Sequence, residues 1–144
     1  MKLQIALLAA LLATPAMAQD APRVYDMGPV VEVTHVKIEP GQFDAYMANL
    51  NSVWRRSMED GKRRGEVLDY KVLSDMAPDA GQGDLVLMVT YKNAAVMDTS
   101  LDELDRRTAV MQGSVAAAQQ ASVARGKMRT ILGSDLYREM TFKR

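Results

Sequence analysis

Cysteine is absent from this chain of 144 residues, and histidine and tryptophan each occur once, at His35 and Trp54. The lack of cysteine excludes disulfide bonds, thiolate metal sites and a lipidated N-terminal cysteine. With a single histidine, the familiar catalytic triads and metal clusters have few residues from which to form. Phosphate-binding loops, nucleophile elbows and zinc-protease signatures are also missing. The sequence therefore predicts no metal site and no cofactor.

Neither sign of charge is in excess, because 18 lysine and arginine residues balance 18 aspartate and glutamate residues. A balanced chain has no electrostatic attraction to a polyphosphate backbone, so nucleic acid is not an expected partner. Basic groups do occur at 55–56, 62–64 and 106–107, where an anionic substrate is one interpretation. Acidic residues stand close to each group, which favours solvated helix faces.

The first 18 residues have the features of a cleavable secretory signal peptide. Lys2 supplies a positive charge, residues 3–13 are apolar apart from Gln4, and Ala16-Met17-Ala18 places small residues at a cleavage site. The apolar run is shorter than the roughly 20 residues that a membrane anchor needs. We therefore expect cleavage after Ala18 and a periplasmic or secreted product with no membrane attachment.

The remaining chain has the size of one domain. Residues 19–28 contain Pro22 and Gly28 and lack a sustained period, which predicts a flexible leader. Residues 29–144 are then expected to form a single α+β domain, since no linker long enough to divide them is present.

Hydrophobic periodicity predicts the order strand, helix, strand, strand, helix, strand within this domain. The expected strands are 29–38, 66–74, 84–91 and 136–142, and the expected helices are 42–61 and 101–126. Ser100 is suited to cap the second helix, and Gly113 leaves open whether that helix is kinked or is two helices. This order is the ferredoxin-like split βαβ arrangement, an antiparallel sheet with helices on one face. Strand 84–91 is apolar on both sides, which favours two sheets facing each other in a homodimer.

The opening of the domain, Val-Glu-Val-Thr-His-Val-Lys-Ile-Glu-Pro-Gly-Gln-Phe-Asp-Ala-Tyr at 31–46, resembles the dimeric α/β-barrel superfamily. That superfamily includes antibiotic-biosynthesis monooxygenase-like proteins, haem-degrading monooxygenases, EthD-like proteins and stress-responsive barrel proteins. The resemblance covers roughly residues 29–143 as a pattern. It implies a barrel formed by two sheets across a two-fold axis, and a cavity between each sheet and its own helices. It does not imply one function, since a fold alone never does.

Two known chemistries of that superfamily are not carried over to this chain. Its haem-degrading members use a histidine of the second helix as the iron ligand, whereas His35 lies on the first predicted strand. Cofactor-free members use an asparagine, a tryptophan and a tyrosine. Asn49, Asn51, Trp54 and Tyr46 all fall on the first predicted helix here, and none can be matched to the positions of that set.

Four side chains remain as candidates. His35 has a pKa near neutrality and could open onto the cavity as a general base, or it could be a half-buried histidine with its hydrogen bonds satisfied. Trp54, Tyr46 and Tyr70 could stack on an aromatic ligand, although helical or strand spacing also explains them as core residues. The methionines are scattered, so core filling explains them better than binding of Cu(I).

Two classes of function stay open. One is an enzyme, a cofactor-independent monooxygenase-like protein acting on a small apolar or aromatic molecule. The other is a non-catalytic periplasmic module for ligand binding, stress response or assembly. In both classes the chain forms the same homodimeric barrel, and it binds either a small molecule or a partner.

The predicted signal peptide can be tested directly. Expression of the full chain should yield a periplasmic protein whose intact mass corresponds to a start at Gln19, because a signal peptidase cleaves after the second alanine of Ala-x-Ala. A protein that still begins at Met1 would contradict the prediction.

Overall fold

The computed structural model describes residues 22–77, 81 and 83–144. The predicted signal peptide and its cleavage site lie outside these residues. The chain forms strand β1 (Tyr25–Ile38), helix α1 (Phe43–Asn49), the π-helical turn η1 (Leu50–Trp54), helix α2 (Arg55–Arg63), strand β2 (Val67–Ser74), strand β3 (Leu85–Tyr91), the 3₁₀ helix η2 (Ala94–Asp98), helix α3 (Leu101–Gln112), helix α4 (Val115–Gly126) and strand β4 (Arg129–Phe142).

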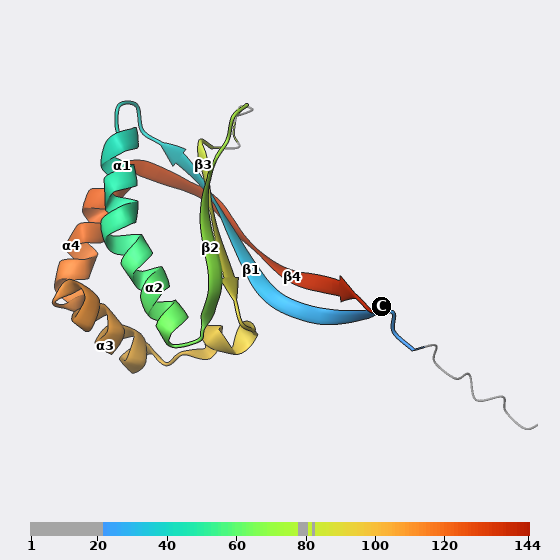
Figure 1. The fold of residues 1–144 in the computed structure, drawn as a ribbon. Coiled ribbons are helices and arrows are strands. Elements are labelled where there is room, and N and C mark those ends of the chain that lie inside the picture. Colours follow the sequence, from blue (N-terminus) through green and yellow to red (C-terminus); the bar gives the residue numbers. More distant parts are fainter. Residues whose placement is uncertain (1–21, 78–80, 82) are drawn as a thin grey trace, which may run out of the picture.

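The four strands form one sheet in the order β2-β3-β1-β4, and every neighbouring pair is antiparallel. Strand β3 thus lies between β1 and β2, and β1 lies between β3 and β4, which is the split βαβ arrangement. The four α-helices all lie on one side of the sheet (Figure 1). The predicted ferredoxin-like α+β fold is confirmed.

The first and last strands are longer than the sequence predicted. Strand β1 begins at Tyr25, so residues 25–28 belong to the sheet and not to the leader: Tyr25 pairs with Phe142. Strand β4 begins at Arg129, ahead of the predicted start at residue 136. Register shifts interrupt the pairing of β1 with β4, and they break the strict alternation by which such strands are recognised. Beyond the ends of β2 and β3, the two strands continue as an arm (Figure 1).

Gly113 separates two helices, which resolves the alternative left open above. Its φ of 87° is a left-handed conformation that ends α3, and its N–H donates to the carbonyl oxygen of Ala109. The Ser114 hydroxyl then caps α4 by accepting from the Ala117 N–H at 3.0 Å. Ser100 caps α3 as predicted, accepting from the Glu103 N–H at 3.4 Å.

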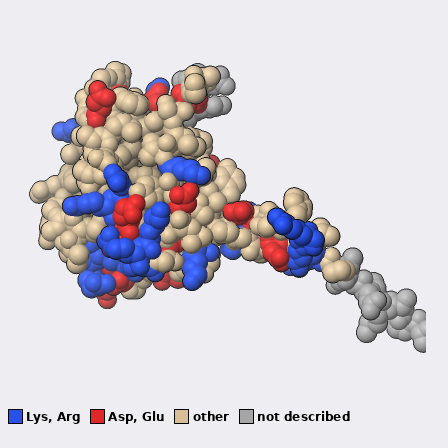
Figure 2. All heavy atoms as spheres, in the orientation of Figure 1, with Lys and Arg blue, Asp and Glu red and all other residues tan. Residues whose placement is uncertain are grey.

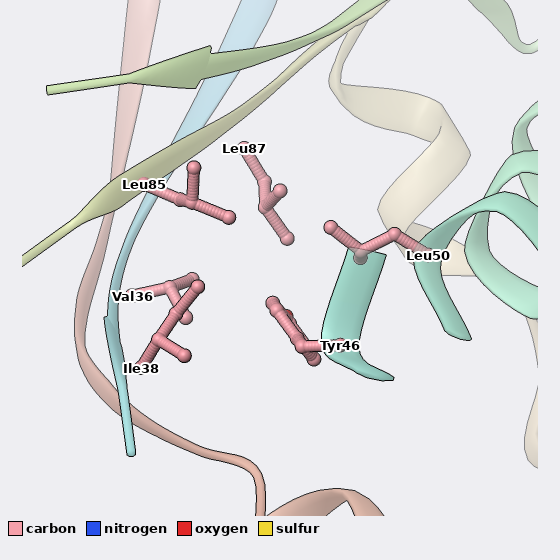
Figure 3. Packing of buried hydrophobic residues seen from close by; sticks show 6 residues of the cluster. All are labelled: Val36, Ile38, Tyr46, Leu50, Leu85 and Leu87. Atoms are coloured by element: carbon pink, nitrogen blue, oxygen red, sulfur yellow. The ribbon is translucent and has the colours of Figure 1, made fainter. Parts of the chain in front are cut away.

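The core lies where α1 and η1 meet the sheet. Alternate residues of β3 point toward the helices, and Leu85 and Val36 are almost completely buried. The cluster, shown in Figure 3, consists of Val36, Ile38, Tyr46, Leu50, Leu85 and Leu87. The side chains on the other face of β3, such as Met88, are half-buried in the single chain. The strand that is apolar on both sides is therefore fully buried on one face only.

Helix α2 approaches the sheet closely because Gly61 lacks a side chain. A Cβ atom at this position would lie 2.7 Å from Cγ2 of Val67, the buried first residue of β2. Among the described residues, no helix is both long and apolar enough to cross a bilayer.

Candidate functional site

A cavity of about 280 Å³ lies between the helices and the sheet. One wall comes from α1, η1 and α2, another from the ends of α3 and α4, and the floor from Leu87 of β3 and Ile131 of β4. Its lining is mixed. The apolar and aromatic side chains are Tyr46, Leu50, Val53, Trp54, Leu87 and Ile131, and the polar ones are Asn49, Ser57, Gln112, Arg125 and Arg129.

The π-helical turn η1 positions much of this lining. The N–H of Arg55 donates to the carbonyl oxygen of Leu50, five residues back. This turn of the helix therefore contains one residue more than a turn of a regular α-helix. Leu50, Val53 and Trp54 all lie in this turn and all line the cavity. Such turns are frequent at functional sites, since they change the direction in which side chains project. The sequence pattern showed only one continuous helix here.

Trp54 stands between this cavity and a smaller one. The smaller space, about 150 Å³, is bounded by η1 and β2, and it shares Leu50 and Trp54 with the larger one. The Trp54 ring meets the Tyr70 ring edge-on, with centroids 5.3 Å apart. Tyr70 is itself held by a hydrogen bond from its hydroxyl to Oε1 of Glu59 at 2.5 Å. This bond raises the pKa of the Tyr70 hydroxyl, and loss of solvent raises it further.

Two arginines bring positive charge to the larger cavity. Arg125 lies in the last turn of α4 and Arg129 is the first residue of β4. The Nη1 atom of Arg125 and the Nε atom of Arg129 are buried, and neither has a hydrogen-bond partner among the described residues. A buried donor without a partner costs about 1 to 3 kcal/mol, and more when the group is charged. Because both arginines line the cavity and no carboxylate of the described residues does, this end of the site is positively charged.

The structure brings three of the four predicted candidates together. Tyr46 and Trp54 both line the cavity, and Tyr70 contacts Trp54 from the neighbouring space. Tyr46 is also part of the core, with only 2% of its surface exposed. Tyr70 does not line the larger cavity itself.

His35 lies elsewhere. It follows Thr34 and precedes the buried Val36, so its side chain projects from the sheet face opposite to α1, α2, α3 and α4. There it faces Asp135, with Nε2 and Oδ2 4.0 Å apart, beside a surface hollow lined by Gly133. His35 therefore does not open onto the cavity that Trp54 lines.

Sequence reasoning missed Arg125, Arg129 and Gln112 as site residues. Arg125 and Arg129 flank Gly126 at the end of an alanine-rich helix, where basic residues are expected for interaction with the helix dipole. No local signal distinguishes them from solvated cations. Only the return of the chain along β4 places both against the cavity.

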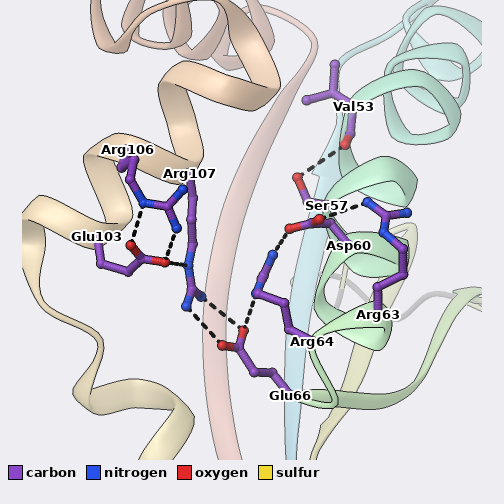
Figure 4. Close-up of polar contacts among 9 residues, drawn as sticks. All are labelled: Val53, Ser57, Asp60, Arg63, Arg64, Glu66, Glu103, Arg106 and Arg107. Atoms are coloured by element: carbon purple, nitrogen blue, oxygen red, sulfur yellow. Dashed lines mark hydrogen bonds and ion pairs between the residues drawn. The ribbon is translucent and has the colours of Figure 1, made fainter.

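Charged contacts hold α3 against the rest of the domain (Figure 4). Arg107 of α3 donates to both carboxylate oxygens of Glu66, at 3.0 Å each, and its Nε donates to Glu103 at 2.6 Å. Arg64 of the turn after α2 contacts both Glu66 and Asp60. The carboxylate of Glu66 thus joins α3 to the end of α2.

These contacts set the protonation of the acids. Burial raises the pKa of Glu66, but the hydrogen bonds from Arg107 and Arg64 outweigh it, and the pKa is lowered from 4.5. Hydrogen bonds from Arg106 and Arg107 lower the pKa of Glu103 to about 2. Both acids are therefore ionised near neutral pH.

The basic groups noted in the sequence gather over α2 and α3 (Figure 2). An open groove of about 520 Å³ there is lined by Arg55, Arg56 and Arg63 together with Glu59 and Met111. Arg56 donates to the carbonyl oxygen of Met111 at 2.8 Å, so part of this charge serves to join the two helices. Within the described part of the chain, no group of three or more histidine, aspartate or glutamate side chains is arranged to hold a metal ion.

Comparison with known proteins identifies the fold. No family model matches the chain, and no curated protein matches it. The crystal structure of protein SO0527 from Shewanella oneidensis aligns with a TM-score of 0.51 and 15% identity, over 81% of this chain and 98% of that one. A dimeric ferredoxin-like protein from an uncultured marine organism aligns with a TM-score of 0.49 and 6% identity, over 83% and 91%. At 15% identity the likeness to the Shewanella protein shows a shared fold alone.

The Glu66 contact predicts a pH-dependent contribution to stability. Glu66→Gln should lower the free energy of unfolding near neutral pH by about 1 to 3 kcal/mol, because it replaces a charged acceptor of partly buried arginine donors. The pKa of Glu66 is lower in the folded state, so its contribution is present above pH 4.5 and is lost as the pH falls through the folded-state value. Urea unfolding at several pH values measures the difference.

Asp69→Asn is the matched control, because the Asp69–Lys71 pair is exposed and should contribute less than about 1 kcal/mol. Equal effects of the two substitutions near neutral pH would show that Glu66 does not hold α3 in place.

Proposed function

We propose that this chain is an exported, homodimeric α/β-barrel protein that binds a small apolar or aromatic molecule in the cavity between its sheet and its helices. The observation that carries the proposal is the cavity itself, with Trp54 and Tyr46 in its wall and polar side chains at a few positions. An apolar pocket with a few convergent polar groups is the usual form of a small-molecule site. The predicted signal peptide supports export.

The size of the cavity limits the ligand. At about 280 Å³ it lies just below the range of about 300–1,000 Å³ typical of pockets for drug-sized molecules. A one-ring compound or a short aliphatic chain fits this space. Trp54 and Tyr46 provide flat apolar surfaces on which such a body can rest.

The composition of the lining supports binding in preference to acid–base catalysis. No histidine, aspartate or glutamate of the described chain lines this cavity, and arginine stays protonated in proteins. His35, the candidate general base, projects from the opposite face of the sheet. A non-catalytic ligand-binding module is therefore the function that the site supports best.

The uncovered face of the sheet supports a homodimer. Alternate residues of β1 and β3 project there, including Val31, Val33, Val86 and Met88, and the pairing of the strands places them side by side. Leu73 of β2 extends this apolar strip and is 43% exposed. A second copy related by a two-fold axis would cover the strip with the same residues.

The arm formed by β1 and β4 also supports a second copy. Its apolar side chains are open to solvent: Met27 is 66% exposed and Phe142 is 78% exposed. A two-stranded ribbon is marginally stable by itself in water. Packing against the partner molecule would bury these side chains beside the sheet interface.

Ligand binding can be followed through Trp54, the only tryptophan of the chain. Addition of 3-phenylpropanoate or its neutral amide should change Trp54 emission in a saturable manner. Val53→Phe should weaken binding about tenfold or more, because the larger ring occupies cavity volume. His35→Ala should leave the affinity unchanged, because His35 lies on the other face. Failure of both compounds to change the emission, with calorimetry also showing no heat, would contradict the proposal.

The dimer can be tested at the centre of the apolar strip. Met88→Lys should convert a dimer into a folded monomer, as measured by light scattering at micromolar concentration, because it places like charges close together across a two-fold axis. The control Leu101→Lys, at a site 78% exposed on the helix side, should remain dimeric. A wild-type protein that is already monomeric would contradict the homodimer.

A further inference from the structure

The charged end of the cavity indicates what kind of molecule it holds. Arg125 and Arg129 carry permanent charge, because a guanidinium group does not lose its proton in a protein. Their buried Nη1 and Nε donors have no acceptor among the described residues, and no carboxylate of those residues lines the cavity. Unlike a lysine or a histidine, these groups cannot relieve burial by becoming neutral. A counter-charge within the cavity would balance both guanidinium groups, because both arginines line it.

The backbone holds the two arginines in place before any ligand arrives. They are joined by the short turn from Gly126 to Met128, and the N–H of Met128 donates to the carbonyl oxygen of Arg125 at 2.9 Å. The carbonyl oxygen of Met128 accepts from the N–H of Glu39 at 3.0 Å, and the Met128 side chain packs against the core. The turn is thus anchored on both sides, which reduces the ordering that binding would require.

We propose that the molecule bound in this cavity is a small carboxylate, with its anionic group on Arg125 and Arg129 and its apolar body against Trp54. The inference rests on the proposed ligand-binding function and specifies its ligand class. The planar fork of a guanidinium matches the two oxygens of a carboxylate, and hydrogen bonds between charged partners are the strongest of their kind. Asn49 and Gln112 add amide groups that can donate to the same oxygens or to a further polar substituent.

The test compares 3-phenylpropanoate with 3-phenylpropanamide, which share a body and differ in charge. Calorimetry and Trp54 emission should give an affinity for the acid at least about tenfold higher than for the amide, as expected for charge-assisted hydrogen bonds. The variants Arg125→Met and Arg129→Met should each lower the affinity for the acid about tenfold and leave that for the amide unchanged. Arg63→Met, at an exposed arginine paired with Asp60, is the control and should change neither.

Stability separates a binding role from a structural one. Each Met variant removes a buried donor that lacks a partner, so it should unfold at the same temperature as the wild type or at a higher one. Variants that unfold at lower temperature and keep their affinity for the acid would show that the arginines are structural, which overturns the inference.

The remaining outcomes distinguish the two proposals. Equal binding of acid and amide to the wild type would overturn the carboxylate inference and leave the ligand-binding function standing. If neither compound binds, both fall.

Discussion

The structure depends on the packing of one helix against one end of the sheet. Tyr46 and Leu50 fill the space over Val36, Leu85 and their neighbours, and this cluster contains most of the fully buried apolar side chains of the described chain. Helices α3 and α4 bury no residue completely. They are held by guanidinium contacts such as that of Arg107 with Glu66, and by the turn at Met128. The first helical pair is packed tightly on the sheet, whereas α3 and α4 are held mainly by polar contacts, and the cavity lies between the two pairs.

The same asymmetry explains the composition of the cavity. Its aromatic side chains and most of its apolar ones belong to α1 and η1, together with Asn49, whereas Gln112 and Arg125 come from the ends of α3 and α4. The π-helical turn at Leu50–Trp54 allows residues of a single helix to serve both the core and the cavity. In a regular α-helix Leu50 and Trp54 would lie about 40° apart around the axis, since four residues advance the direction of the side chain by about 400°. The extra residue in the π-helical turn changes the direction of the side chains that follow it relative to those of α1.

Much of the fold could be predicted because each element carries its own local pattern. The spacing of Tyr46, Leu50 and Trp54 indicates a helix, and the β-branched run before Pro40 indicates a strand. The start of β4 could not be predicted, because the adjacent apolar residues Ile131 and Leu132 interrupt alternation at a bulge. The residues of the site could be predicted only in part. Trp54 and Tyr46 stand out as aromatic residues, whereas Arg125 and Arg129 become recognisable only through their place in the cavity lining, which is a property of the folded chain.

The pairing of the first strand with the last has a consequence for the order of folding. Strand β1 is central in the sheet, yet one of its two neighbours, β4, ends two residues before the C-terminus. The contacts between them span almost the whole sequence, and such long-range contacts form late and slowly. The sheet cannot be completed until β4 is available, so β1 keeps one open edge until the last strand has joined it.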